Sequence, residues 1–140
     1  MSAYIPVELR RQVADRAKGY CAYCRSSEHL MGVTFEVDHI IPEASGGRTV
    51  LENLCLSCPV CNRSKAQRLL VADPVTQELV PLFHPVDEEW HHHFQWTENG
   101  SQLLGLTPTG RATIVALRMN REAIIQLRRY WTILGLYPPS

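Results

Sequence analysis

The amino-acid sequence predicts a mixed α+β fold, and three observations lead to this prediction. Two Cys-x-x-Cys pairs, Cys21–Cys24 and Cys58–Cys61, lie on either side of a short central segment. Within that segment, residues 33–39 are β-branched and aromatic with partial alternation, which favours a strand. Helical patterns flank the pairs, over residues 6–18 and from Pro59 onward.

The length and composition are those of one globular domain. The chain has 140 residues, 45% of them apolar, and its formal net charge is zero. It contains no run of about 18 apolar residues, so we expect no transmembrane helix and no membrane partner. Residues 1–8 lack the charged and apolar regions of a signal peptide, which makes the cytoplasm the expected compartment. There, a Cys-x-x-Cys pair binds metal more often than it forms a disulfide.

Basic residues are grouped, although a net charge of zero is weak evidence against a protein that coats nucleic acid without specificity. Arg63, Lys65 and Arg68 follow the last cysteine without an acid nearby. Residues 101–140 hold one acid, Glu122, and the arginines Arg111, Arg118, Arg121, Arg128 and Arg129. These groups are either contacts for nucleic acid or ordinary solvated helix faces.

Local signals place the elements of the first half. Pro6 suits the first turn of the first helix, and Gly19 suits the position after its end. Residues 42–47 have the composition of a loop. The helix that begins near Pro59 is expected to continue to about Leu70.

The second half predicts a C-terminal extension made of a β-hairpin and two helices. An Asn-Gly dipeptide is the turn signal of a hairpin over 90–97 and 102–106. The helices are expected over 108–117 and 121–134, with Asn120 as the N-cap of the second. The apolar residues expected in their core are Leu117, Ile124, Ile125, Leu127, Trp131 and Leu134.

The two cysteine pairs form a candidate structural zinc site. Zinc binds four thiolates in a tetrahedron with Zn–S distances of about 2.3 Å, and a complete set of four cysteine ligands leaves no open position for catalysis. The expected ligands are Cys21, Cys24, Cys58 and Cys61. Cys55 with Cys58 offers a competing pair, but we favour the later pair because Asn62 then follows the metal site directly. Cys55 is expected to be a small buried residue. Disulfides or reduced, uncoordinated cysteines are the alternative, and an odd number of cysteines disfavours a pure disulfide framework.

Asp38, His39 and Asn62 form a candidate catalytic site. Hydrolysis of a phosphodiester requires an activated water, neutralisation of the phosphate charge and support for the leaving oxygen. Asp38 and Asn62 offer the oxygen ligands that Mg²⁺ prefers, and the His39 imidazole can deprotonate water near neutral pH. Adjacent strand residues point to opposite faces, so the chain must bend after Asp38 or the substrate must insert between the two side chains. The alternative is that Asp38 and Asn62 are turn or cap residues and His39 is a core histidine.

Together these motifs resemble the HNH endonuclease family. Glu36-Val-Asp-His-Ile-Ile-Pro42, Asn53-Leu54 and Cys58-x-x-Cys-Asn-x-x-Lys65 follow the order of the family motif and are close to its spacing. The resemblance covers about a third of the chain. It implies the ββα-metal fold, DNA as the substrate, and Mg²⁺ or Mn²⁺ as catalytic metal beside the structural zinc.

The resemblance also implies roles for individual residues. His39 would be the general base, and Asn53 would tie the loop to the backbone and so fix that base. Asn62 stands where the last His of the family motif is found, and it would bind the catalytic metal together with Asp38. This departure from the literal motif leaves open whether His39 alone handles protons.

Three charged residues around this site have implied roles as well. Arg63 and Lys65 would contact phosphate at the start of the helix, although solvated charges are the alternative for both. Glu36 would orient His39.

A composition shift near residue 70 divides the chain into a nuclease-like part, 1–70, and the extension, 71–140, which we expect to pack together as one compact unit. The extension is a candidate for homodimerisation, for covering the active site, or for contacting nucleic acid through Arg111, Arg118 and Arg121. The run His91–His93 is expected to be surface or half-buried strand residues, because consecutive strand residues cannot all face one ion.

Two functions therefore compete. The first is a metal-dependent HNH endonuclease acting on DNA, with RNA less favoured. The second is a catalytically inactive zinc-binding module that contacts nucleic acid or protein. The presence of Asp38, His39, Asn53 and Asn62 together favours the enzyme.

Overall fold

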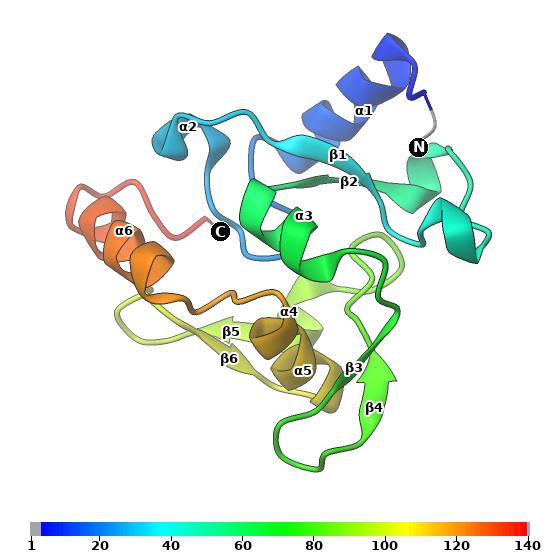
Figure 1. Cartoon of the computed structure of the whole chain (residues 1–140). Helices are drawn as coiled ribbons and strands as arrows, with labels where there is room; N and C mark the ends of the chain where they lie inside the picture. Colours follow the sequence, from blue (N-terminus) through cyan, green and yellow to red (C-terminus); the bar gives the residue numbers. More distant parts are fainter. Residues whose placement is uncertain (1–3, 140) are drawn as a thin grey trace.

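The computed structural model describes residues 4–139; Met1–Ala3, the start of the segment inspected for a signal peptide, and Ser140 lie outside the described residues. The elements in chain order (Figure 1) are α1 (Val7–Ala17), α2 (Glu28–Met31), β1 (Glu36–His39), η1 (Glu43–Ser45), η2 (Leu51–Asn53), β2 (Leu54–Ser57), α3 (Pro59–Lys65), β3 (Leu70–Ala72), β4 (Leu79–Pro81), α4 (Trp90–His93), β5 (Phe94–Trp96), β6 (Leu103–Gly105), α5 (Pro108–Ala116) and α6 (Glu122–Ile133). This is a mixed α+β fold, as the sequence predicts. Its strands pair as the two-stranded antiparallel sheets β1–β2, β3–β4 and β5–β6.

None of the described helices has the length and apolarity needed to cross a membrane.

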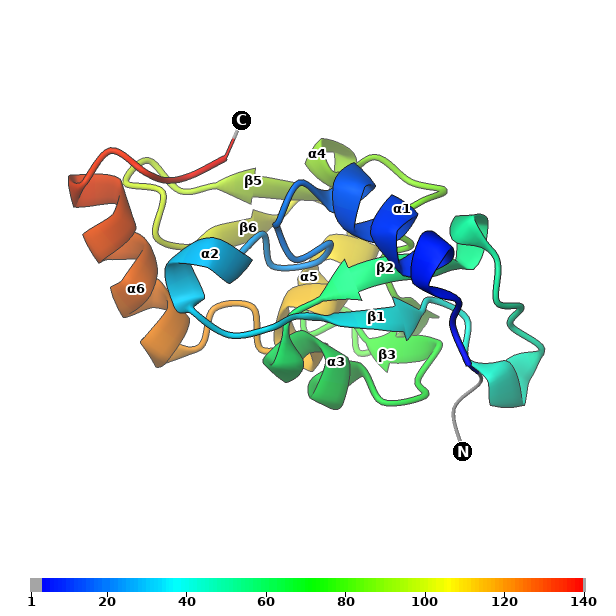
Figure 2. The same cartoon turned by 90° about the horizontal axis from the view of Figure 1, so that it is seen from above.

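The first sheet and the helix that follows it form a β-β-α unit. β1 and β2 are paired so that His39 lies opposite Leu54. α3 begins directly after β2, because the Cys58 sulfur caps its N-terminus and Pro59 occupies its first turn. α1 and α3 lie on opposite faces of this sheet (Figure 2), and both contact it. The unit places Cys58 beside the start of β1, and it brings Lys65 at the end of α3 to Asp38 and His39 at the end of β1.

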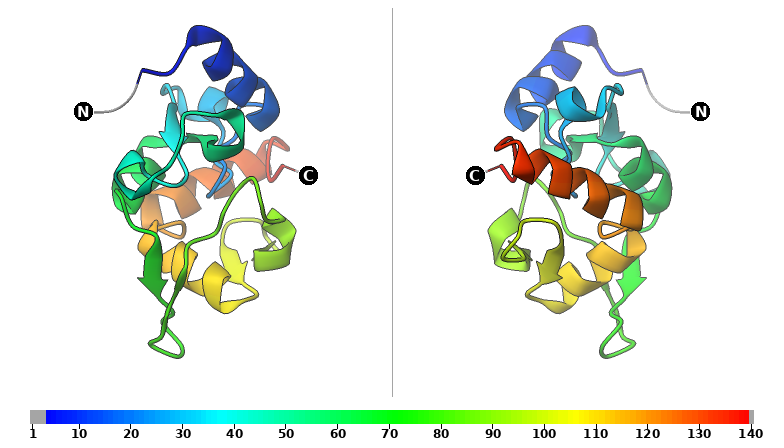
Figure 3. Two further views of the ribbon diagram at one scale, coloured as in Figure 1. Left: turned by 90° about the vertical axis from the view of Figure 1, so that its right-hand side faces the viewer. Right: turned by 90° about the vertical axis from the view of Figure 1, so that its left-hand side faces the viewer.

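One hydrophobic core joins this unit to the residues beyond 70. Leu54 and Tyr23 from the first half share that core with Phe94 and Leu117 from the second half. The indole nitrogen of Trp90 also donates a hydrogen bond of 2.8 Å to the carbonyl oxygen of Tyr23. By contrast, the β3–β4 hairpin projects away from the body of the molecule (Figure 3).

Arg128 ties the last helix to the first cysteine pair. Its side chain is completely buried, and it donates hydrogen bonds of 3.2 Å to the carbonyl oxygens of Cys24 and Ser101. Its guanidinium lies over the ring of Trp96, 5.4 Å from the centroid. Arg128 is therefore an interior residue and does not belong to the exposed basic group expected from the sequence.

Two boundaries in the first half differ from the predicted ones. α3 ends at Lys65 and does not continue toward Leu70; the next residue, Ala66, has φ of 50° and ψ of −125°, outside the helical region. Residues 70–72 instead pair with residues 79–81 as a hairpin. β1 is also shorter than predicted, since it begins at Glu36.

The predicted hairpin and the two C-terminal helices are present, with local corrections. Residues 90–93 form a helical turn, α4, before β5 begins, so the histidine run is not on a strand. Of the three histidines, His93 is buried and the other two are exposed. The residue that precedes α6 is Arg121, not Asn120. The Asn120 side chain instead bonds both the backbone nitrogen and the carbonyl oxygen of Leu103, at 2.8 and 2.9 Å.

The predicted C-terminal core is correct in part. Leu117, Ile124 and Trp131 are buried. The prediction for Leu134 is wrong: this residue is 69% exposed and follows the end of α6 at Ile133, while Tyr137 further along the chain packs with Ile124 and Trp131.

Candidate functional site

The four cysteines of the two pairs meet in one buried cluster. Their sulfur atoms all lie within 4.8 Å of one another, and Cys24 Sγ is 3.7 Å from Cys58 Sγ. A tetrahedron with Zn–S bonds of about 2.3 Å has sulfur–sulfur edges of about 3.8 Å. The backbone nitrogens of Cys58 and Cys61 donate to the sulfurs of Cys21 and Cys58, both at 3.4 Å, which suits thiolates. All four cysteines are free of disulfides, so the cluster has the donor set and geometry of a structural zinc site.

The close packing of the four thiols shifts their pKa values in opposite directions. Burial raises the pKa of Cys21 well above that of an ordinary thiol. Hydrogen bonds from the neighbouring cysteines, Cys21 first, hold the pKa of Cys24 well below it. Four buried thiolates repel one another unless a cation compensates their charge, and Zn²⁺ supplies that charge.

Cys55 lies outside this cluster, so the competing pair with Cys58 is excluded. It is on β2, 2% exposed, opposite Asp38. Burial raises its pKa to about 12. Cys55 is thus a small buried residue, as expected from the sequence.

Asp38 and His39 line one surface cavity of about 540 Å³, together with Glu43, Ala66 and Gln67. Adjacent strand residues normally face opposite sides, but His39 is the last residue of β1. The chain bends there, and the cavity forms between that bend and the segment after α3. The structure therefore brings both side chains to the same opening.

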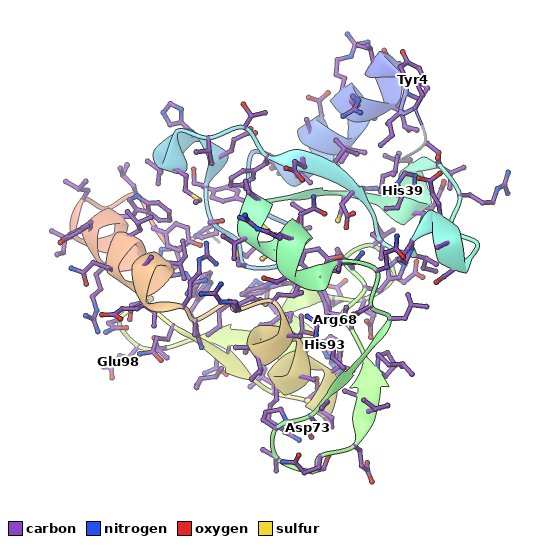
Figure 4. All side chains as sticks on the ribbon, viewed as in Figure 1. Tyr4, His39, Arg68, Asp73, His93 and Glu98 are labelled. Atoms are coloured by element: carbon purple, nitrogen blue, oxygen red, sulfur yellow. The ribbon has the colours of Figure 1, made fainter. Side chains whose placement is uncertain are left out.

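The His39 ring is held by residues of the loop between β1 and β2. Its Nε2 is 2.9 Å from the hydroxyl oxygen of Thr49, and its Nδ1 is 3.9 Å from a carboxylate oxygen of Glu43. Figure 4 shows His39 beside this loop segment, and the residue as a whole is 8% exposed. Thr49 and Glu43 therefore determine the orientation of the imidazole.

Asn53 closes the loop that contains Thr49 and Glu43. Its amide nitrogen donates to the carbonyl oxygens of Ile41 and Arg48, at 3.0 and 2.9 Å. Its amide oxygen accepts the backbone N–H of Ile41 at 2.9 Å. The loop is so tight that a Cβ atom on Gly47 would lie 1.7 Å from the carbonyl oxygen of Ile41.

The Asp38 carboxylate faces α3. Its Oδ2 lies 3.1 Å from Nζ of Lys65, and the two side chains are 16% and 2% exposed. This charge contact does not have hydrogen-bond geometry, and Oδ2 is otherwise a buried atom without a hydrogen-bond partner. Burial raises the pKa of Asp38, against the opposing effect of Lys65. The carboxylate is thus only partly compensated and can accept a cation.

A comparison with models of protein families identifies a family to which this region is similar. Residues 21–68 match the HNH endonuclease family. The matched segment contains the cysteine cluster, the Asp–His pair and the β-β-α unit, and it covers about a third of the chain. The resemblance inferred from the sequence is confirmed for this HNH segment. A search among curated proteins finds no match.

Within the HNH segment, Asn62 contacts Glu36. Its amide nitrogen donates to the Glu36 carboxylate across the space between α3 and β1. Glu36 and Asp38 share one face of β1 because they are two residues apart. Glu36 was expected to orient His39, but its carboxylate bonds to Asn62. The residues that contact the His39 ring are Thr49 and Glu43.

The basic residues of α3 in the HNH segment differ in environment. Arg63 is exposed. Lys65 is buried, and its ammonium donates a 3.0 Å hydrogen bond to the carbonyl oxygen of His39. Sequence reasoning missed the inward direction of Lys65 and the roles of Thr49 and Glu43. The only signal for them is position: Glu43 lies four residues after His39, and Thr49 follows the Gly-Gly turn.

Proposed function

We propose that this protein is a metal-dependent HNH endonuclease that hydrolyses phosphodiester bonds of DNA. The observation that carries the proposal is that Asp38 and His39 line one cavity within the segment that matches the family. A hard oxygen ligand and an imidazole base at one opening are the groups that phosphodiester hydrolysis requires.

In this proposal His39 is the general base. In the tautomer that carries its proton on Nε2, the ring donates a hydrogen bond to the Thr49 hydroxyl oxygen. The lone pair of Nδ1 is then available to take a proton from the attacking water. The Glu43 carboxylate, 3.9 Å from Nδ1, then stabilises the imidazolium that forms. Asn53 acts as a positioning residue, because its hydrogen bonds hold the loop that carries both partners of the ring.

Asp38 and Asn62 are the proposed ligands of a catalytic Mg²⁺ or Mn²⁺. The Asp38 carboxylate fits this role as a hard oxygen ligand that lines the cavity, with Lys65 3.1 Å from Oδ2 on its other side. The Asn62 nitrogen is used by Glu36, so the amide oxygen is the ligand atom that Asn62 can offer. Such a cation, when bound, would neutralise charge on the phosphate and support the leaving oxygen.

Arg63 and Lys65 take different roles in this proposal. Arg63 is exposed, which supports a direct contact with phosphate. Lys65 was expected at phosphate too, but its ammonium is buried against Asp38 and the carbonyl oxygen of His39. We therefore assign Lys65 to positioning the Asp–His pair, so that a buried cation keeps the carboxylate in place.

The proposal is tested by cleavage of supercoiled plasmid DNA. The parent is expected to nick or linearise the plasmid with Mg²⁺ or Mn²⁺ and to be inactive with EDTA. His39→Ala is expected to abolish cleavage while the protein stays folded and keeps its zinc, since His39 is the proposed base and is not one of the clustered cysteines. Equal cleavage by parent and variant would refute the assigned base. A folded, zinc-loaded parent that cuts nothing would favour the inactive zinc module.

The extension is further proposed to mediate homodimerisation. Exposed apolar side chains at the end of α6 support this, with Ile133 80% and Leu134 69% exposed.

A further inference from the structure

A basic groove lies on the α1 side of the molecule. Two adjoining cavities, of about 620 and 260 Å³, share Arg16, Tyr20 and Arg25 in their walls. Lys18 adds a further cation to the larger one. Among the described residues, these walls contain no aspartate or glutamate. We call the surface formed by Arg16, Lys18, Tyr20 and Arg25 the basic groove.

Two cationic residues of the groove, Lys18 and Arg25, have a positive φ, a backbone conformation that glycine adopts more easily. Lys18 has φ of 54° and Arg25 has φ of 62°, both in the left-handed region. Glycine takes this conformation without steric cost, whereas a residue with a Cβ does not. One position ends α1 and the other follows the first cysteine pair. Long basic side chains at both positions are therefore consistent with a role for the side chains themselves.

The guanidinium N–H groups of Arg25 have no hydrogen-bond acceptor within the described part of the chain. Its guanidinium lies over the Trp90 ring, 4.9 Å from the centroid, and this contact uses the face of the group. No hydrogen bond or ion pair joins its N–H groups to another described residue. The planar edge of a guanidinium matches two phosphate oxygens, so Arg25 is suited to hold a phosphate group.

The groove is coupled to the strand that carries His39. Arg16 donates a 3.0 Å hydrogen bond to the carbonyl oxygen of Leu51 and a further one to that of Leu54. Leu54 lies opposite His39 in the β1–β2 pair. Arg16 therefore joins the groove to β2, and α1, which ends one residue after Arg16, lies on the face of the sheet opposite α3 (Figure 2).

We propose that the basic groove binds the phosphate backbone of the DNA that flanks the point of cleavage. This inference rests on the proposed nuclease function. The charged residues in the walls of the groove are all cations, and electrostatic contacts of this kind carry no sequence information. The groove would therefore add affinity and orient the flank, without selecting a target sequence.

The test is the salt dependence of DNA binding, measured by fluorescence anisotropy with a labelled duplex in buffer without Mg²⁺ or Mn²⁺, so that nothing is cut and the zinc is kept. The parent is compared with Lys18→Gln, Arg25→Gln and the double variant. Arg129→Gln is the matched control, because Arg129 is exposed and outside the groove. Zinc content and thermal unfolding are measured for each variant, since Arg25 is next to a cysteine ligand and packs on Trp90.

Each lost phosphate contact is expected to lower the slope of log K against log salt by about 1, and the double variant by about 2. Binding at low salt should weaken roughly 5- to 10-fold per contact. Lys18→Gln is decisive if Arg25→Gln does not fold. An unchanged slope, a loss no larger than that of Arg129→Gln, or a parent that binds no duplex DNA would overturn the inference. A preference of the groove for single-stranded RNA over duplex DNA would overturn it too.

The failure of the groove is distinguishable from the failure of the proposed function. A parent that cuts plasmid while its groove variants keep the parental slope refutes only the groove. A groove that lowers the slope in a protein that cuts nothing refutes only the nuclease.

Discussion

The ammonium of Lys65 lies 3.1 Å from Oδ2 of Asp38 and 3.0 Å from the carbonyl oxygen of His39, so one buried cation contacts both residues of the Asp–His pair. The contact joins α3 to the end of β1. The contact holds the Asp38 carboxylate beside the cavity. Burial raises the pKa of Asp38, and the positive charge of Lys65 opposes this effect.

Replacing Lys65 by Met should destabilise the protein by about 3 kcal/mol, because the removal of one partner leaves a mostly buried carboxylate without compensation. Urea unfolding measures the change. Arg63→Met, on the exposed side of the same helix, is the control and should change stability by less than about 0.5 kcal/mol. Adding Asp38→Asn to Lys65→Met should recover part of the loss. If the two Met variants are equally stable, the contact has no stabilising role.

Replacing Asn53 by Ala removes three hydrogen bonds to the loop. We expect a loss of about 2–3 kcal/mol, roughly one for each bond. In the cleavage assay, kcat should fall more than KM changes, because the loop carries the partners of the base. Glu52→Gln, at the neighbouring exposed position, should leave both quantities unchanged. Loss of stability with full activity would remove Asn53 from the positioning of His39.

Cys58→Ser and Cys55→Ser form a matched pair for the zinc site. Metal analysis should find that the first variant loses zinc and much of its thermal stability, because metal binding contributes directly to folding. The second should keep its zinc, since Cys55 is outside the cluster. Equal zinc content in the two proteins would contradict the assigned ligands.

The pH dependence of stability tests the ion pair between Asp73 and Arg111, which are joined by hydrogen bonds of 3.0 and 2.7 Å. Arg111 holds the pKa of Asp73 well below its usual range. A lowered folded-state pKa stabilises the protein above the unfolded value of about 3.9, and the stabilisation is lost as pH falls through the folded-state pKa. Asp73→Asn should therefore be less stable than the parent at neutral pH, and the difference should shrink in acid. Urea titrations at several pH values measure it, with Glu78→Gln as the control. A difference that is constant with pH would exclude the charge as its cause.

If the extension mediates self-association, formation of the dimer should depend on the exposed side chain of Ile133. Light scattering should show the parent as a dimer and Ile133→Glu as a monomer, because a buried charge at an apolar contact is costly. Val115→Glu is a useful control, since Val115 is also exposed but lies on α5. A monomeric parent at high concentration would refute this prediction.

The cysteine pairs, β1 and the start of α3 were predictable because their signals are local, whereas β2 followed only from the family resemblance. The spacing of each cysteine pair determines a metal-binding turn, and a proline after Cys58 marks the start of α3. The end of α3 was not predictable in this way. Residues 66–70 contain no proline or glycine, and what stops the helix is the pairing of the next segment with β4.

The surroundings of the candidate site depend on contacts between distant residues. Thr49 and Glu43 reach His39 only because Asn53 folds the loop back on itself. Residue type also misleads at Lys65 and Arg128, since long basic side chains are usually exposed. Both are buried here because carbonyl oxygens accept their donors.

The bond from Arg128 to the carbonyl oxygen of Cys24 has a consequence for the integrity of the whole chain. A protein cut after residue 70 would keep every proposed catalytic residue and zinc ligand, yet it would lose the helix that covers the first cysteine pair. It would also expose Tyr23 and Leu54, which now share their core with Phe94 and Leu117. We therefore expect the two halves to unfold in a single transition. On this expectation, the boundary near residue 70 separates motifs but not cooperative units.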